Sequence, residues 1–185
     1  MKNASRIISV LSLLAIIFLT ACGGGGGDTS SNTGGGSSLL AASFTPDQAA
    51  PGPDSVTLQE GAASGNAVTV NVQVTDTPDL TGGSFDLFYD PARFTFLSHN
   101  SGNLFESGGV TPIYGVNEPT SGHLVIGVGG ANPVSVNGSE TLIRLTFRAE
   151  AQGSGAVTLD LADLQGASGG SVPGIAWSGG TLTGS

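Results

Sequence analysis

Strict alternation of apolar and polar residues constrains this chain more than any other feature of its sequence. The stretch AVTVNVQVTD, residues 67–76, places four valines on one side of an extended backbone and Thr69, Asn71 and Gln73 on the other. A side-chain period of two is that of a β-strand, whereas an amphipathic helix repeats about every 3.6 residues. The sequence therefore predicts a strand with one face on a core and one face toward solvent.

The same alternation recurs along most of the chain. Further strands are predicted at residues 55–60, 84–90, 94–98, 111–116, 123–130, 140–151, 156–164 and 175–183. Turn signals rich in Gly, Pro, Asn and Asp separate them, at 79–83, 100–102, 108–109, 120–122, 137–138, 153–155 and 166–170. In the predicted strand at 156–164, the alternation places Val157, Leu159 and Leu161 on the side that faces the core. No stretch has the helical period, so we expect an all-β sandwich of about nine antiparallel strands.

The first residues have the pattern of a secretion signal. Lys2 and Arg6 precede an apolar run at residues 7–19, which ends in Leu-Thr-Ala-Cys at residues 19–22. A run of about 13 residues is shorter than the ~20 that cross a bilayer as a helix. It matches the apolar part of a cleaved signal instead.

The Leu-Thr-Ala-Cys ending resembles the lipobox of bacterial lipoproteins, in which the cysteine is acylated and becomes the mature N-terminus. That resemblance implies that residues 1–21 are removed and that Cys22, the only cysteine of the chain, carries lipid. Gly23 follows where an aspartate would indicate retention at the inner membrane. We therefore expect export to the outer membrane or cell surface of a Gram-negative bacterium. The alternative is an ordinary secretion signal with an incidental cysteine.

Residues 22–54 are rich in Gly, Ser and Pro and are expected to form a flexible linker, because they offer too little apolar surface to fold. Phe44 interrupts this composition and could already belong to the folded domain, which we place at residues 55–185. Without the signal, three arginines remain against 14 acidic side chains, a formal charge of −11. Such a charge argues against nucleic acid or an anionic membrane surface as a partner. We therefore expect the protein to bind the membrane through the lipid alone.

A dense aromatic segment lies at residues 82–100. Asp90-Pro91-Ala92-Arg93 fits a type I turn, because Asp accepts backbone hydrogen bonds and Pro sets the required φ. Strand phase places Phe85, Tyr89, Phe94 and Phe96 in the core. Phe88 shares the opposite face with two aspartates, and we expect it under a loop, in the other layer of the sandwich, or exposed and functional.

The order of these segments resembles the cohesin domain, the β-sandwich module of scaffoldin proteins. The likeness lies in the alternating strand at 67–76, an aromatic strand ending in Tyr89-Asp90-Pro91, and a later Leu-x-x-Leu-x-Phe strand at 142–147. It implies a nine-stranded jelly roll that binds dockerins, calcium-loaded helical modules, through one sheet face. Many dockerin-binding members carry Asn and Asp just before the aromatic strand, where this chain has Gly82-Gly83-Ser84.

Few residues qualify as a functional site. The candidate binding face comprises Ser84, Asp86, Phe88, Tyr114 and Trp177. The three aromatic residues could stack on sugar rings, although Trp177 alternates in phase with Ile175 and is then expected in the core.

No cofactor is expected, and a metal site is only weakly indicated. Asp76 and Asp79 are candidate Ca²⁺ ligands, but their spacing matches no calcium loop, and turn caps explain them equally well. His99 and His123 are isolated from any nucleophile or carboxylate pair, so the sequence predicts no enzyme.

Three functions are compatible with these observations. The first is a non-catalytic binding module on a lipid anchor, whose partner is a secreted or envelope protein, dockerin-like proteins included. The second is a carbohydrate-binding module that attaches to polysaccharide, since cohesins are related in fold to some such modules. The third is a structural surface component with no single ligand.

Overall fold

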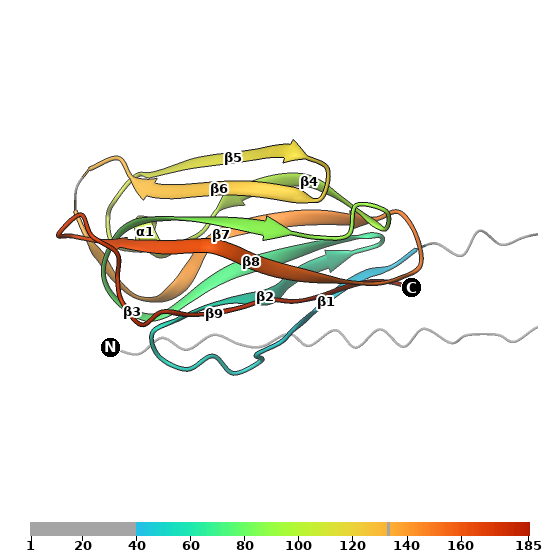
Figure 1. Ribbon diagram of the computed structural model, residues 1–185, viewed down its shortest axis with the longest axis horizontal. Coiled ribbons are helices and arrows are strands. Elements are labelled where there is room, and N and C mark those ends of the chain that lie inside the picture. The colour runs from blue at the N-terminus through green and yellow to red at the C-terminus, as the bar shows by residue number, and fades with distance from the viewer. Residues whose placement is uncertain (1–39, 133) are drawn as a thin grey trace, which may run out of the picture. The chain divides into compact units, whose positions relative to one another are not determined.

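The computed structural model describes residues 40–132 and 134–185. The predicted signal, Cys22 and the linker up to residue 39 lie outside the described residues. The described part is a β-sandwich with one short helix (Figure 1). Its elements are β1 (Ala42–Pro46), β2 (Ser55–Ser64), β3 (Ala67–Phe88), β4 (Phe94–Ser101), α1 (Leu104–Ser107), β5 (Pro112–Thr120), β6 (His123–Gly130), β7 (Val136–Ala149), β8 (Gly153–Gly166), β9 (Ala176–Ser178) and β10 (Gly180–Gly184).

The predicted all-β sandwich is confirmed, with ten strands in place of about nine. Strand β1 is additional, the segment 175–183 divides into β9 and β10, and the predicted strands 67–76 and 84–90 are one continuous strand. All pairings are antiparallel except that of β9 with β2, which is parallel. No helix in the described part of the chain is long and apolar enough to cross a membrane.

Strand β3 belongs to both sheets of the sandwich. Its first half pairs with β2 and β7, and its second half pairs with β6 and β8. One sheet therefore has the order β9-β2-β3-β7-β4, and the other has the order β1-β10-β8-β3-β6-β5. Between the two halves, from Val74 to Leu80, the pairing of β3 with β7 shifts in register.

The bend in β3 replaces the turn expected at residues 79–83. Asp76 and Asp79 have φ values of 50° and 51°, in the left-handed region that Asp tolerates better than most residues. Such residues form β-bulges, which bend a strand without ending it. Pairing with β7 accordingly continues to Leu80, and the turn prediction was wrong because bulge and turn share the same residue types.

The core lies between the sheets and follows the predicted alternation. Val68, Val70, Val72 and Val74 are fully buried on the inward side of β3, and Thr69, Asn71 and Gln73 lie between them on the outward side. The second half of β3 and the facing strands complete the core with Phe85, Leu87, Ile126, Leu145 and Phe147. Burial of one such side chain stabilises the fold by about 1.5–3 kcal/mol.

The folded domain begins before residue 55. Strand β1 pairs with β10 over its whole length, and Phe44 is only 2% exposed. The backbones of Ala41 and Ser185 also exchange two hydrogen bonds, of 2.9 and 3.0 Å. The boundary at residue 55 therefore lies too late, because five alternating residues are a weak signal beside a Gly/Ser-rich segment.

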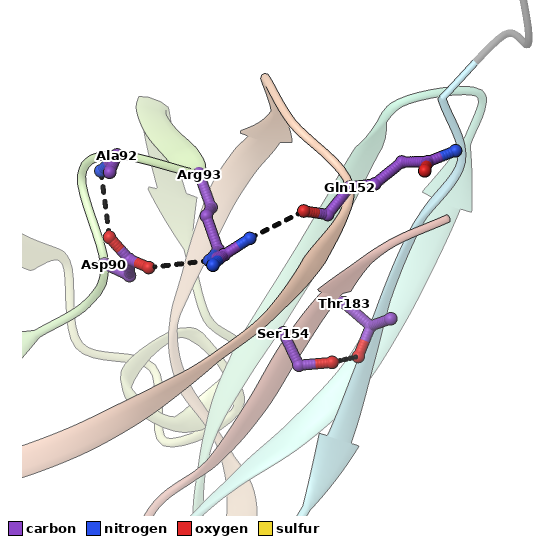
Figure 2. Close-up of polar contacts among 6 residues, drawn as sticks. All are labelled: Asp90, Ala92, Arg93, Gln152, Ser154 and Thr183. Carbon is purple, nitrogen blue, oxygen red and sulfur yellow. Dashed lines mark hydrogen bonds and ion pairs between the residues drawn. The ribbon is translucent and has the colours of Figure 1, made fainter.

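The predicted tight turn after β3 is confirmed (Figure 2). Asp90 accepts hydrogen bonds from the backbone N–H of Ala92 through Oδ1 (2.9 Å) and from that of Arg93 through its carbonyl oxygen (3.2 Å). Arg93 pairs with the Asp90 carboxylate at 3.1 Å and donates to the Gln152 carbonyl oxygen at 2.7 Å. Phe85, Tyr89 and Phe94 are buried beside the turn, so most of the aromatic segment is core.

Truncation of Phe44 tests whether β1 is part of the cooperative domain. Phe44→Ala should lower the free energy of unfolding by about 3–5 kcal/mol, because a buried ring is replaced by a cavity. The neighbouring Thr45→Ala, on the exposed side of β1, should change it by less than about 0.5 kcal/mol. Urea unfolding of the two variants provides the comparison, and equal effects would show that β1 adds nothing to the fold.

Candidate functional site

The candidate site is the outward face of the sheet formed by β8, β3, β6 and β5. Residues directly opposite one another on paired strands share a face, so the register defines its members. We call this surface the acidic face. By this register it comprises Ser84, Asp86 and Phe88 of β3; His123, Val125 and Gly127 of β6; Ile113, Gly115 and Asn117 of β5; and Thr158, Asp160 and Asp163 of β8. Leu161 is exposed at the bulge between Asp160 and Asp163 and borders this face.

Phe88 lies on the surface at one end of the acidic face. Its ring is 37% exposed and stacks on the His123 ring, with centroids 4.4 Å apart and planes 15° from parallel. Nε2 of His123 in turn lies 2.8 Å from Oδ2 of Asp86. The two contacts position the Phe88 ring against His123 and leave part of it available to a ligand.

Negative charge gathers on this face. Asp86 lies directly opposite Asp160, and Ser84 lies directly opposite Asp163. Within residues 40–132 and 134–185, the arginines lie elsewhere: Arg144 and Arg148 on β7 of the other sheet, and Arg93 in the turn after β3. The three carboxylates therefore have no guanidinium on their own face to neutralise them.

Apolar surface accompanies the charge. Ile113 is 60% exposed, and Val125 is also exposed. Between them Gly115 lies opposite Gly127, and no atom lies within 4 Å of the position that a Cβ would take at either glycine. The surface at the Gly115–Gly127 pair is therefore open, so that the backbone of another protein could approach it closely.

Leu161 lies at the bulge beside this face, and the prediction of its position from the sequence was wrong. Alternation assigned it to the core with Val157 and Leu159, yet it is 75% exposed. A bulge is the reason: β8 advances three residues, from Asp160 to Asp163, where β3 advances two. Leu161 itself has a φ of 45°, which reverses the phase of the strand.

Tyr89 fixes the end of β3 next to Phe88. Its hydroxyl donates to Oε1 of Glu118 and accepts from the backbone N–H of Phe96 at 3.3 Å. Glu118 also accepts from the Gly122 N–H at 3.1 Å, in the turn between β5 and β6. Burial, and then the hydrogen bond to the carboxylate, raise the pKa of Tyr89 to about 12.

Two of the five predicted site residues lie off the acidic face. The Tyr114 hydroxyl accepts from the Gly102 N–H and donates to the Leu142 carbonyl oxygen, both at 3.1 Å, so the ring points into the sandwich. Burial raises the pKa of this hydroxyl as well. Trp177 packs against the core with its ring centroid 5.7 Å from that of Phe85. Only Ser84, Asp86 and Phe88 of the predicted set lie together.

The candidate calcium ligands lie at the bend of β3. Asp76 accepts from the Ser139 hydroxyl at 3.1 Å, and Asp79 accepts from the Ser135 hydroxyl at 3.3 Å. Among the residues that the structure describes, no group of three or more His, Cys, Asp or Glu is placed to hold a metal ion. The two serine contacts match the alternative role of these aspartates as caps of an irregular strand.

Comparison with known proteins identifies the family. The family model described as "Cohesin domain" matches residues 55–171. No curated protein matches the chain.

Solved structures resemble the fold. The non-cellulosomal cohesin from the hyperthermophilic archaeon Archaeoglobus fulgidus is 20% identical, with a TM-score of 0.53 over 69% of this chain and 88% of that one. The second type II cohesin module of the ScaA scaffoldin of Acetivibrio cellulolyticus is 16% identical, with a TM-score of 0.58 over 69% and 87%. A type II cohesin–X–dockerin complex from Acetivibrio cellulolyticus matches at 14% identity, with a TM-score of 0.55 over 66% and 92%.

Ultraviolet titration of tyrosinate tests the Tyr89 contact, since the chain has only two tyrosines. In a Tyr114→Phe background, Tyr89 should ionise at about 12, and Glu118→Gln should move its pKa toward 10. Because the folded pKa exceeds the unfolded one, this contribution to stability is complete below pH 10 and declines as pH rises to about 12. Ionisation near pH 10 in the folded protein would contradict the hydrogen bond.

Proposed function

This chain belongs to the cohesin family, and on that premise we propose that it is a non-catalytic module whose acidic face binds a dockerin-like protein. The observation that carries the proposal is the exposure of Phe88, Ile113 and Val125 on one flat sheet face. Exposed apolar groups that gather on one face are typical of protein interaction sites. The related complex that contains a dockerin supports the same type of partner.

The geometry favours a protein over a polysaccharide. A sugar platform needs several exposed aromatic rings, and the acidic face offers Phe88 alone, while Tyr114 and Trp177 turn toward the core. Protein partners instead use mixed apolar and charged surfaces with close backbone approach. The open surface at Gly115 and Gly127 allows such an approach.

The missing Asn and Asp before the aromatic strand imply a different set of contacts. A Cβ at Gly82 would lie 2.8 Å from the Val128 carbonyl oxygen, and one at Gly83 would lie 2.7 Å from Cδ2 of Leu164. These two positions are too crowded to carry recognition side chains. The polar contacts to a partner would then come from Asp86 and from the Asp160 and Asp163 carboxylates of β8, which lie on the same face.

The proposal includes display on the cell envelope. Removal of residues 1–21 and acylation of Cys22 would anchor the chain at the outer membrane or cell surface, and the Gly/Ser-rich segment after Cys22 would act as a tether. The lipobox-like ending and the single cysteine support this part. The role of the protein is then to hold a secreted partner at the envelope without transforming it.

Substitutions on the acidic face should weaken partner binding. We expect Phe88→Ala to reduce affinity about tenfold or more, because an exposed aromatic ring is the type of side chain that most often dominates binding energy in protein interfaces. Leu97→Ala is the matched control and should leave affinity unchanged, since Leu97 is 44% exposed on β4 of the other sheet. Titration calorimetry against a panel of recombinant dockerins measures both, with urea unfolding to verify the fold. Absence of micromolar binding to any dockerin, or an equal effect of Leu97→Ala, would contradict the proposal.

Lipidation has its own test. Cys22→Ser should abolish incorporation of an alkyne-labelled fatty acid in the native host, because the acylated thiol is lost, and should release the protein from the membrane fraction. Ser30→Ala in the same segment should leave labelling unchanged. Labelling that persists in Cys22→Ser would show that the lipid is attached elsewhere.

A further inference from the structure

We propose that Leu161 is the anchor at the border of the acidic face: it inserts into an apolar pocket of the partner, and Lys or Arg side chains surround that pocket. This inference rests on the proposed function and specifies the partner's chemistry. It starts from the conformation of Leu161, which is unfavourable in two independent ways. The side chain is 75% exposed, and the backbone is left-handed, with a φ of 45°.

Both features destabilise the isolated domain. An exposed leucine forfeits the gain of burial, and a left-handed backbone brings Cβ close to the following carbonyl oxygen. Strained residues persist where their surroundings enforce them, and they concentrate at ligand contacts. Of the four non-glycine residues with positive φ among those described, three are aspartates, and Leu161 is the exception.

The surroundings hold Leu161 in place. The Asp160 carboxylate accepts the Leu161 N–H at 2.8 Å, which stabilises the bulge from the outer side. On the inner side, Leu159 and Ala162 pack against the core and fix the strand before and after the bulge. The backbone of Leu161 is therefore held in place before any partner arrives, which lowers the entropy lost on binding.

Charge selects the partner. Asp160 and Asp163 flank the exposed Leu161 along β8, and Asp86 lies opposite Asp160 on the acidic face. His123 beside Asp86 is the one basic side chain of that face. A second copy of this face would bring carboxylates against carboxylates, so self-association is disfavoured. A surface with Lys or Arg around an apolar pocket would match both the leucine and the charge, and attraction should weaken as salt screens it.

A displayed library tests this chemistry. Dockerin modules with randomised recognition helices, displayed on yeast, are sorted for binding to the purified full chain. Selected binders should be enriched in Lys and Arg, and should lose at least tenfold in affinity when salt rises from about 50 mM to about 500 mM, which shortens the Debye length severalfold. Both Leu161→Gly and Leu161→Ala should lower the affinity of the selected binders at least tenfold. Leu97→Gly, at a bulge of β4, should leave that affinity unchanged.

Stability separates an anchor from a structural residue. Leu161→Gly relieves the backbone strain, so its urea midpoint should equal or exceed that of the wild type while affinity falls. A lower midpoint, binders that tolerate Leu161→Gly, or binders without basic residues would overturn the role of Leu161 and leave the proposed function intact. A library that yields no binder to the wild-type chain would overturn the proposed function, and this inference with it.

Discussion

The pairing of β3 with four strands is the constraint on which the rest of the structure depends. Its first half holds β2 and β7, its second half holds β6 and β8, and the bend at Asp76 and Asp79 carries it from one sheet to the other. Because side chains alternate, a slip of one residue would turn Phe85 and Leu87 outward and bury Asp86. One strand register therefore determines both the core and the acidic face.

The acidic face is less favourable to folding than the opposite sheet surface. Asp86 and Asp160 lie directly opposite one another, an arrangement of like charges that destabilises a strand pair. Nε2 of His123 lies 2.8 Å from the Asp86 carboxylate, and solvent screens the repulsion between the two aspartates. The outward residues of the other sheet include Thr69, Asn71 and Arg144, which are uncharged or basic. Two of the three arginines in the described part of the chain, Arg144 and Arg148, thus lie on the sheet opposite the acidic face.

Sequence periodicity predicted the sandwich and the core of the regular strands, because one buried face imposes alternation on each of them. It failed where local geometry overrides that period: at the bend near Asp79, at the bulge of Leu161, and at the short strand β1. For the candidate site, strand phase placed Ser84, Asp86 and Phe88 together. The contributions of β6 and β8 depend on pairing between segments far apart in sequence, so His123 and Asp160 could not be predicted to lie beside Phe88 and Asp86.

The hydrogen-bonded pairing of β1 with β10 has a mechanical consequence. Force applied to the chain at Ala41 reaches the acidic face along the backbone ladder by way of β1, β10 and then β8. When the pull lies along the strand axis, the five residue pairs of β1 and β10 resist it together in shear. When the pull is perpendicular, the same pairs open one after another. The direction of a pull at Ala41 relative to β1 therefore sets the force at which this strand pair opens.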